Sequence, residues 1–350
     1  MKNEETIISL KEIADMVGTS ISTVSRVLNN PEYKCHNSLL RTKIINAARE
    51  MHYTPNENAR RLKKGSLKEK RSMNVIVTRD ESDPFFTELI RIIEVTSHNH
   101  GFFISHIYHD EQLSEMCDRV DNEWKSEVKK KYSEHMKDVD AIFILGKAGK
   151  GTVDVLKDMC KHIVALSRNY EKLEVDEVIC DGEENARKVI KYLAQMGHQS
   201  IAYVGHNNRE SRFKGFKLAM LEEGIEYNDE LCYGCKANIQ HGINAARYFL
   251  SMSQPPTGIF CSNDIIAIGL IGEIRKDLYY RPAVISFDDI QEAQNIKPML
   301  STVHVPKEEM VNLAMVLLND QFEKGHRSGL KVEVPGKLII RESSNWSNYN

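Results

Sequence analysis

The sequence contains no apolar run long enough to cross a membrane, which would need about eighteen or more consecutive apolar residues. Its first residues are polar and charged and lack the apolar core of a secretory signal, which predicts a cytoplasmic protein. Only seven cysteines occur in 350 residues, and their odd number and scattered positions predict reduced thiols. These absences argue against a membrane-spanning or disulfide-stapled architecture.

Signals for metal, cofactor and catalytic sites are also sparse. Cys232 and Cys235 form a lone CxxC pair, whereas a zinc site would need a second pair or histidines at matching spacing. The glycine-rich stretch 146–151 lacks the Gly-Lys-Ser/Thr ending of a phosphate-binding loop, so an ordinary turn is favoured. No nucleophile elbow or zinc-protease motif is present. The sequence therefore predicts no bound metal, no cofactor and no enzymatic activity.

The first thirty residues contain two short amphipathic helices joined by a tight turn. Gly18 can end the first helix with a positive φ, Ser20 can cap the second, and Asn30-Pro31 ends it. A third amphipathic run covers residues 40–51. Such helices predict either an ordinary helical hairpin or a helix-turn-helix that reads the major groove of DNA.

Charge favours the DNA-binding interpretation of this segment. Residues 1–72 carry 14 lysines and arginines against 8 aspartates and glutamates, while the whole chain has a net charge of −3. A basic head on an acidic body is expected when one part of a protein must bind phosphates.

Residues 56–64 predict a helix of about two turns, too short to be stable alone in water. One interpretation is a flexible, solvated tether. The other is a helix that folds against a second copy of itself and DNA, with Leu62 as an apolar wedge in the minor groove.

From residue 73 onward, strand-like apolar runs alternate with helical patterns, which predicts doubly wound parallel sheets. There are too many strands for one sheet, so we predict two similar lobes with a break near residues 170–176. Polar groups follow several of the strands, where ligands of such sheets bind. They are Asp83, Ser167-Arg168, Asn263-Asp264 and Asp288-Asp289. Together with an aromatic side chain they suit a sugar, although each residue alone could be a loop-end cap.

Short motifs along the chain resemble the LacI/GalR family of bacterial transcription regulators. The similar stretches are residues 22–29, 53–56, 83–86, 181–186, 197–205, 212–216, 263–264, 285–289 and 300–303. The resemblance implies a helix-turn-helix domain at residues 1–55, a hinge helix and linker at 56–72, and a two-lobed body like periplasmic sugar-binding proteins at 73–342. It also implies three crossings between the lobes, with lobe 1 at about 73–175 plus 303–327 and lobe 2 at about 176–300 plus 328–342. Residues 343–350 would form a tail.

The resemblance also implies roles for individual residues. Base-reading positions correspond to Ile21, Ser22 and Arg26, phosphate-contacting positions to Thr23, Ser25 and Asn29, and hinge positions to Asn56, Ala59 and Leu62. Effector-pocket positions correspond to Asp83, Phe86, Ser167, Arg212, Asn263 and Asp288. The implied partners are a near-palindromic double-stranded DNA operator, a small sugar effector and a second copy of the chain.

The predicted function is a repressor of a sugar-utilisation operon, and the alternative is a sugar-binding module without gene control. The stretch 175–178 and the long charged insertion 111–138 resemble those of the β-galactoside and galactose regulators within the family, and this resemblance implies a slight preference for galactose or a β-galactoside as effector. The role of segment 111–138 itself is not evident from its sequence. The tail after Arg341 has no leucine heptads, which favours a dimer over a tetramer.

Overall fold

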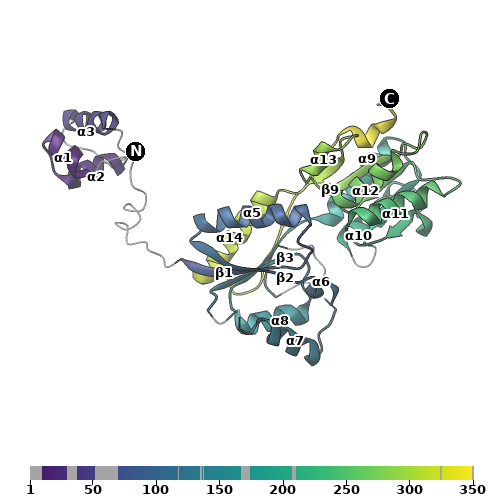
Figure 1. The fold of residues 1–350 in the computed structure, drawn as a ribbon, viewed down its shortest axis with the longest axis horizontal. Coiled ribbons are helices and arrows are strands. Elements are labelled where there is room, and N and C mark those ends of the chain that lie inside the picture. Colours follow the sequence, from purple (N-terminus) through teal and green to yellow (C-terminus); the bar gives the residue numbers. More distant parts are fainter. Residues whose placement is uncertain are drawn as a thin grey trace, which may run out of the picture. The chain divides into compact units, whose positions relative to one another are not determined.

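The computed structural model describes residues 10–29, 38–51, 70–116, 118–134, 136, 138–166, 174–206, 210–323 and 325–348 (Figure 1). The chain divides into two units, Met1–Glu69 and Lys70–Asn350, which we describe separately. The predicted hinge positions Asn56, Ala59 and Leu62 lie outside the described residues, and so does Ser167.

The first unit contains helices α1 (Leu10–Val17), α2 (Ile21–Asn29) and α3 (Ser38–Glu50). Ile13, Val24 and Ile44 have no exposed surface and form the centre of a small core shared by the three helices. Gly18 has the predicted positive φ, at 71°. The Ser20 hydroxyl accepts a hydrogen bond from the Thr23 amide at 3.1 Å, which confirms the predicted cap of α2.

The second unit begins with a six-stranded, fully parallel sheet in the order β11-β5-β4-β3-β1-β2. Its strands are β1 (Arg71–Val77), β2 (Phe102–His109), β3 (Ala141–Leu145), β4 (Ile163–Leu166), β5 (Asp176–Cys180) and β11 (Lys331–Val334). Helices α5 (Pro84–Asn99) and α14 (Lys307–Glu323) cover one face, and α7 (Asn122–Tyr132) and α8 (Lys150–Met159) cover the other (Figure 1).

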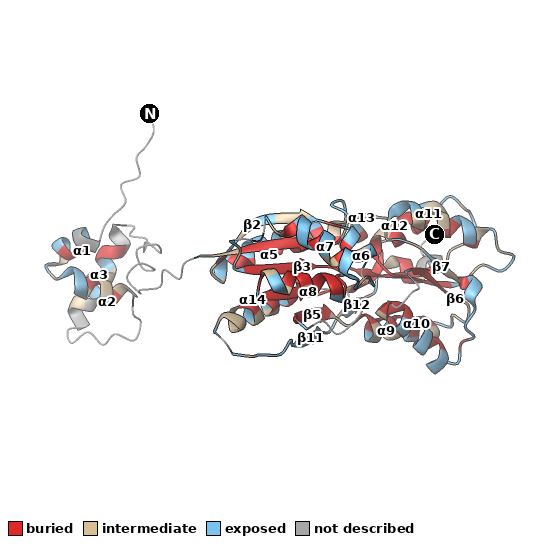
Figure 2. Cartoon of the chain, turned by 90° about the horizontal axis from the view of Figure 1, so that it is seen from below, coloured by how far each residue is buried: buried red, intermediate tan, exposed pale blue. Residues whose placement is uncertain are grey.

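A second six-stranded sheet has the order β12-β10-β9-β8-β6-β7 and is parallel except for β12. Its strands are β6 (Ile201–Gly205), β7 (Cys232–Gly234), β8 (Gly258–Cys261), β9 (Ala283–Asp288), β10 (Ser301–His304) and β12 (Lys337–Ile339). The helices are α9 (Gly182–Gln195) and α10 (Ser211–Glu222) on one face and α11 (Ile239–Leu250) and α12 (Asp264–Ile274) on the other (Figure 2). Four short helices complete the described part of the fold: α6 (Gln112–Glu115), α13 (Glu292–Asn295) and the 3-10 segments η1 (Asp229–Leu231) and η2 (Glu342–Asn348).

Buried residues, coloured red in Figure 2, lie in the strands of both sheets and in the helices that pack on them. In β1, Met73, Val75 and Val77 belong to one apolar cluster and Ile76 to another, as expected when successive side chains of a strand point to opposite faces. None of the helices in the described part of the chain is both long and apolar enough to cross a membrane.

Two strands lie in a different lobe from the one expected. Residues 176–300 and 328–342 were expected in lobe 2, yet β5 and β11 belong to the first sheet. The reason is pairing, because β5 aligns with β4, with Val164 opposite Asp176, and β11 aligns with β5. Residues 303–327 were expected in lobe 1, but β10 pairs with β9 in the second sheet up to His304. The chain therefore first passes from the first lobe to the second after β5, and not at residues 170–176 as expected.

The charged segment 111–138 has a structural role. Its helix α7 buries Trp124, Val128 and Tyr132 against α8 and the first sheet. The Trp124 indole donates a hydrogen bond to the Thr152 hydroxyl of α8 at 3.2 Å. Its lysines and glutamates lie on the outer side of the helix, which explains why the segment is highly charged and yet part of the fold.

Candidate functional site

Both sheets of the second unit have the same strand order near their middle. The chain leaves β1 toward β2 and then returns to β3 on the other side, and it repeats this path from β6 to β7 and then to β8. In sheets of this kind the change of direction leaves a crevice at the carboxyl ends of the two central strands. The topology therefore places one crevice after β1 and β3 and another after β6 and β8.

A cavity of about 1490 Å³ is lined by the residues that follow these strand ends. Thr78 and Lys147 come from the first sheet, and His206 and Ser262 come from the second. Gly146 closes this end of the first sheet with φ of 94°, and a Cβ atom there would lie 2.5 Å from the Thr78 hydroxyl. Only glycine fits this close approach, so Gly146 forms a tight bend just before Lys147, which lines the cavity, while Lys150 and Gly151 of the glycine-rich stretch already belong to α8.

Arg212 is a buried cation in the wall of this cavity, in the first turn of α10. Its guanidinium donates hydrogen bonds to the Glu210 carboxylate and the Ser262 carbonyl, and it lies 5.1 Å from the centre of the Phe287 ring. The Tyr203 hydroxyl donates to the other oxygen of Glu210 at 2.9 Å. Arg212 is therefore fixed in one orientation before any ligand binds.

Glu210 was not among the residues expected from the sequence. It is 5% exposed and immediately precedes α10 without capping it. A carboxylate two residues before an arginine at a helix start is too common a pattern to be assigned a role from the sequence alone.

The other expected pocket residues divide between two cavities. Asp83 lines the large cavity and also caps α5 by accepting a hydrogen bond from the Phe85 amide at 3.0 Å. Phe86 and Asp288 line a second cavity of about 40 Å³, and Arg212 lines both. Arg212 thus lies at both cavities, next to Asp83 in the larger one and to Phe86 and Asp288 in the smaller one.

Asn263 does not line either of these two cavities. Its side-chain oxygen accepts a hydrogen bond from the Ile266 amide at 3.0 Å and caps α12. Its contact with an effector remains a prediction from the resemblance.

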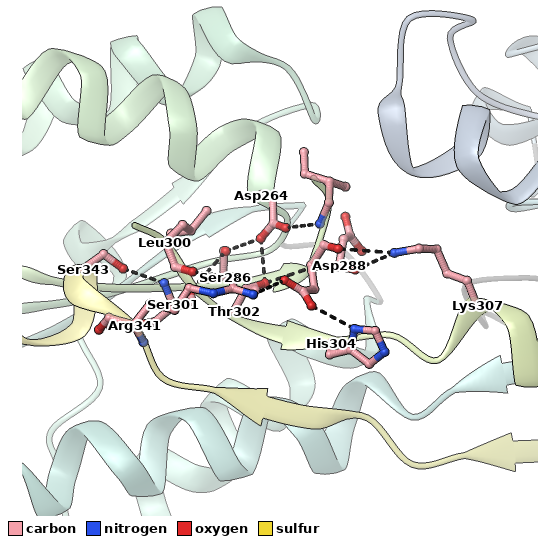
Figure 3. A network of polar contacts seen from close by, with 12 residues as sticks. Asp264, Ser286, Asp288, Leu300, Ser301, Thr302, His304, Lys307, Arg341 and Ser343 are labelled. Atoms are coloured by element: carbon pink, nitrogen blue, oxygen red, sulfur yellow. Dashed lines mark hydrogen bonds and ion pairs between the residues drawn. The ribbon is translucent and has the colours of Figure 1, made fainter. Parts of the chain in front are cut away.

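Asp264, the next residue, is fully buried at the junction of β9, β10 and α12 (Figure 3). Its carboxyl accepts hydrogen bonds from the hydroxyls of Ser286 and Thr302, the latter at 2.6 Å, and from the Ile290 amide at 2.8 Å. Burial and the negative charge of Asp288 raise the pKa of Asp264 to about 7.

Asp288 and Asp289 form a turn in which both residues have a positive φ, at 123° and 52°. Lys307, which is 5% exposed, donates to the carbonyl oxygens of both residues at 3.1 and 3.4 Å (Figure 3). The Asp289 carboxylate contacts His304 at 2.8 Å and Arg341 at 2.7 Å. Lys307 belongs to α14, which packs on the first sheet, whereas His304 ends β10 of the second sheet. Side chains from both lobes therefore stabilise the turn.

Helix α2 of the first unit presents the predicted DNA-reading side chains at its surface. Ile21 is 45% exposed, and Ser22 and Arg26 are also exposed. Thr23 and Ser25 are half-buried, and the side chain of Asn29 lies outside the described part. No group of three or more metal-binding side chains is found among the described residues.

Comparisons with known proteins agree with these two units. Residues 9–56 match the family of bacterial regulatory proteins named lacI, and residues 190–344 match a periplasmic binding protein-like domain. The chain belongs to the LacI family. Its relatives include the transcriptional repressor CytR of Escherichia coli K12, which is 28% identical over 98% of both chains. The repressor PurR of Mannheimia succiniciproducens is 25% identical over 96% of this chain and 98% of its own.

Solved structures show the same fold. A complex of the regulator CelR with cellobiose matches 96% of this LacI-family chain and 99% of its own with a TM-score of 0.67 at 20% identity. An Enterococcus faecium regulator with bound ribose matches 78% of this chain and 98% of its own, with a TM-score of 0.63 at 23% identity.

The first unit is therefore a LacI-family regulatory domain, and the relatives named here are transcriptional repressors rather than enzymes. The slight preference for a galactose-type effector has no support from these relatives or neighbours.

Proposed function

We propose that this LacI-family repressor acts in the cytoplasm as a homodimer and controls a sugar-utilisation operon. The exposed face of α2, with Ile21, Ser22 and Arg26, would enter the major groove of each operator half-site. The hinge positions Asn56, Ala59 and Leu62 would contact the minor groove between the half-sites. A small polyhydroxylated molecule in the cleft would change the affinity of the dimer for its operator.

The observation that carries this proposal is the cavity between the carboxyl ends of the two sheets. Its wall combines the fixed guanidinium of Arg212 with the carboxylate of Asp83 and the hydroxyls of Thr78 and Ser262. Such a set offers both donors and acceptors to vicinal hydroxyls. Similar folds hold cellobiose and ribose, which supports a carbohydrate-like ligand here.

The test is a gel-shift titration of the full chain against DNA that flanks its own gene, with unrelated DNA as competitor. We expect selective binding at moderate salt. Arg26→Ala should weaken selective binding by roughly 10- to 100-fold, because one bidentate base contact would be lost. Lys43→Ala, on the exposed surface of α3, removes the same charge and serves as the control. Binding that is equally weak on flanking and unrelated DNA would refute the proposal.

A further inference from the structure

An ion pair connects the two lobes at the large cavity. The Lys236 ammonium, two residues after β7 in lobe 2, lies 2.7 Å from a carboxylate oxygen of Glu115 in α6 of lobe 1. Both residues line the cavity, and α6 lies at the edge of lobe 1 that faces lobe 2 (Figures 1 and 2). The pair therefore joins the two sides of the cavity directly.

The three connections of the chain between the lobes lie away from this cavity. They are residues 181, 305–306 and 335–336, and none of these residues lines it. Cys180, Gly182 and Val305, beside two of the connections, line the smaller cavity instead. Lobes that are joined by short connections can open around them by hinge motion. The ion pair thus lies where such a motion would separate the lobes.

The backbone that carries Glu115 is held on lobe 1. Leu113 of α6 is 1% exposed and belongs to the same apolar cluster as Trp124. The segment after α6 lies against α8, because a Cβ atom at Gly151 would be 2.4 Å from the Arg119 carbonyl oxygen. An opening of the cleft would therefore pull Glu115 away from Lys236.

The backbone that carries Lys236 is held on lobe 2. The Cys235 amide donates a hydrogen bond to the Gly205 carbonyl at the end of β6, at 3.0 Å. The Lys236 carbonyl oxygen contacts the Asn238 amide at 3.1 Å and the His241 ring at 2.9 Å. Each member of the ion pair therefore belongs firmly to its own lobe.

The exposure of the two side chains sets the strength of the contact. Lys236 and Glu115 are 68% and 46% exposed, so water and salt screen their attraction. The carboxylate of Glu115, and then that of Glu111, hold the pKa of Lys236 above its usual value. A pair this exposed changes an equilibrium by about two- to fivefold, which is enough to bias the lobes and too little to lock them.

We propose that the Lys236–Glu115 pair is a latch across the cleft: it holds the lobes in the arrangement seen in the structure and sets how often the cleft opens to exchange its ligand. This inference rests on the proposed function only in taking the cleft as the effector site. It gives the acidic start of segment 111–138 a part in controlling access to the cavity.

Single-molecule energy transfer between dyes on the two lobes of the full chain tests the latch. Azidophenylalanine in place of Lys129 in α7 and of Leu221 in α10, both exposed, carries the dyes. Glu115→Lys and Lys236→Glu each replace attraction by repulsion. Each should increase the ratio of long-distance to short-distance molecules by about two- to fivefold. The double variant restores opposite charges and should return the ratio of the parent.

Lys214→Glu is the matched control for charge reversal. Lys214 pairs with Glu183 at 2.8 Å and is 67% exposed, but both residues belong to lobe 2. This variant should keep the ratio of the parent. Salt at about 1 M, where the Debye length is about 3 Å, should move the parent toward the single variants.

Milder variants cover the case in which a reversed charge disturbs the fold. Glu115→Gln and Lys236→Met remove one charge without adding the opposite one, and they should change the ratio in the same direction by a smaller factor. Thermal melting checks that each variant is folded.

The latch is refuted if the single variants keep the distance distribution of the parent, if the double variant does not restore it, or if Lys214→Glu changes it equally. The measurement needs neither DNA nor an effector. Its failure would leave a selective gel shift intact, and a chain without selective DNA binding could still show the latch.

Discussion

Neighbouring residues at the start of α12 have different roles, although the sequence suggested one site for both. Asn263 caps the helix, while Asp264 joins β9, β10 and the following turn through three donors. The sequence correctly indicated polar groups after strands, because such groups must satisfy the backbone of the helix that follows. Which of them faces a ligand depends on side-chain direction, which the chain order does not specify.

Asp264 predicts a pH dependence of stability. Its pKa in the folded protein is about 7, above the usual value of 3.8, so the folded state binds more protons than the unfolded state between these pH values. The free energy of unfolding should therefore fall as pH rises from about 4 to about 7. Asp264→Asn stays neutral and should lose this part of the slope.

Urea denaturation at several pH values measures this slope. Glu226→Gln, at an exposed position, is the control and should keep the dependence of the parent protein. A parent-like slope in Asp264→Asn would contradict the assignment.

At the scale of elements, segment 111–138 contains helix α7, in which many charged residues surround a few buried apolar ones. The apolar positions of α7 are few, but they are large, and Trp124 and Tyr132 are 5% and 1% exposed. The Tyr132 hydroxyl donates to Asp110 at 2.7 Å, which fixes the helix to the end of β2. The role of this segment was not evident from the sequence, because only the sheet beneath α7 explains what the helix covers.

Trp124→Ala should lower the free energy of unfolding by about 3–5 kcal/mol, because it leaves a large cavity between α7 and α8. Lys129→Ala lies on the exposed side of the same helix and should change stability by less than about 0.5 kcal/mol. Urea denaturation of both variants compares them directly. Similar losses in the two variants would mean that α7 is not part of the cooperative fold.

At the scale of the whole second unit, one lysine connects the two lobes. Lys307 begins α14 on the first sheet, contacts Glu88 of α5 at 3.1 Å, and donates to the carbonyls of Asp288 and Asp289 at the end of β9. Its charge lies 5.3 Å from the centre of the Phe85 ring. A movement of one lobe against the other would have to break or redirect these contacts.

Lys307→Met keeps the length of the side chain but removes its donors. We expect the free energy of unfolding to fall by about 1–3 kcal/mol, because buried carbonyl oxygens lose their partner. Glu309→Gln, an exposed change on the same helix, is the control. Thermal and urea unfolding measure the effect, and a loss no larger than that of the control would show that Lys307 does not join the lobes.

The sequence by itself determined the class of this protein. Capped helices, a basic head and alternating strand and helix patterns depend on local propensity and periodicity, and they identified the helix-turn-helix and the doubly wound body. Tertiary structure decided which strands share a sheet. In the structure β5 and β11 belong to the first lobe, and Arg212 contacts Glu210. The physical reason is that the pairing of parallel strands and the contacts between buried side chains join residues far apart in the chain. A pattern in neighbouring residues does not specify such long-range contacts.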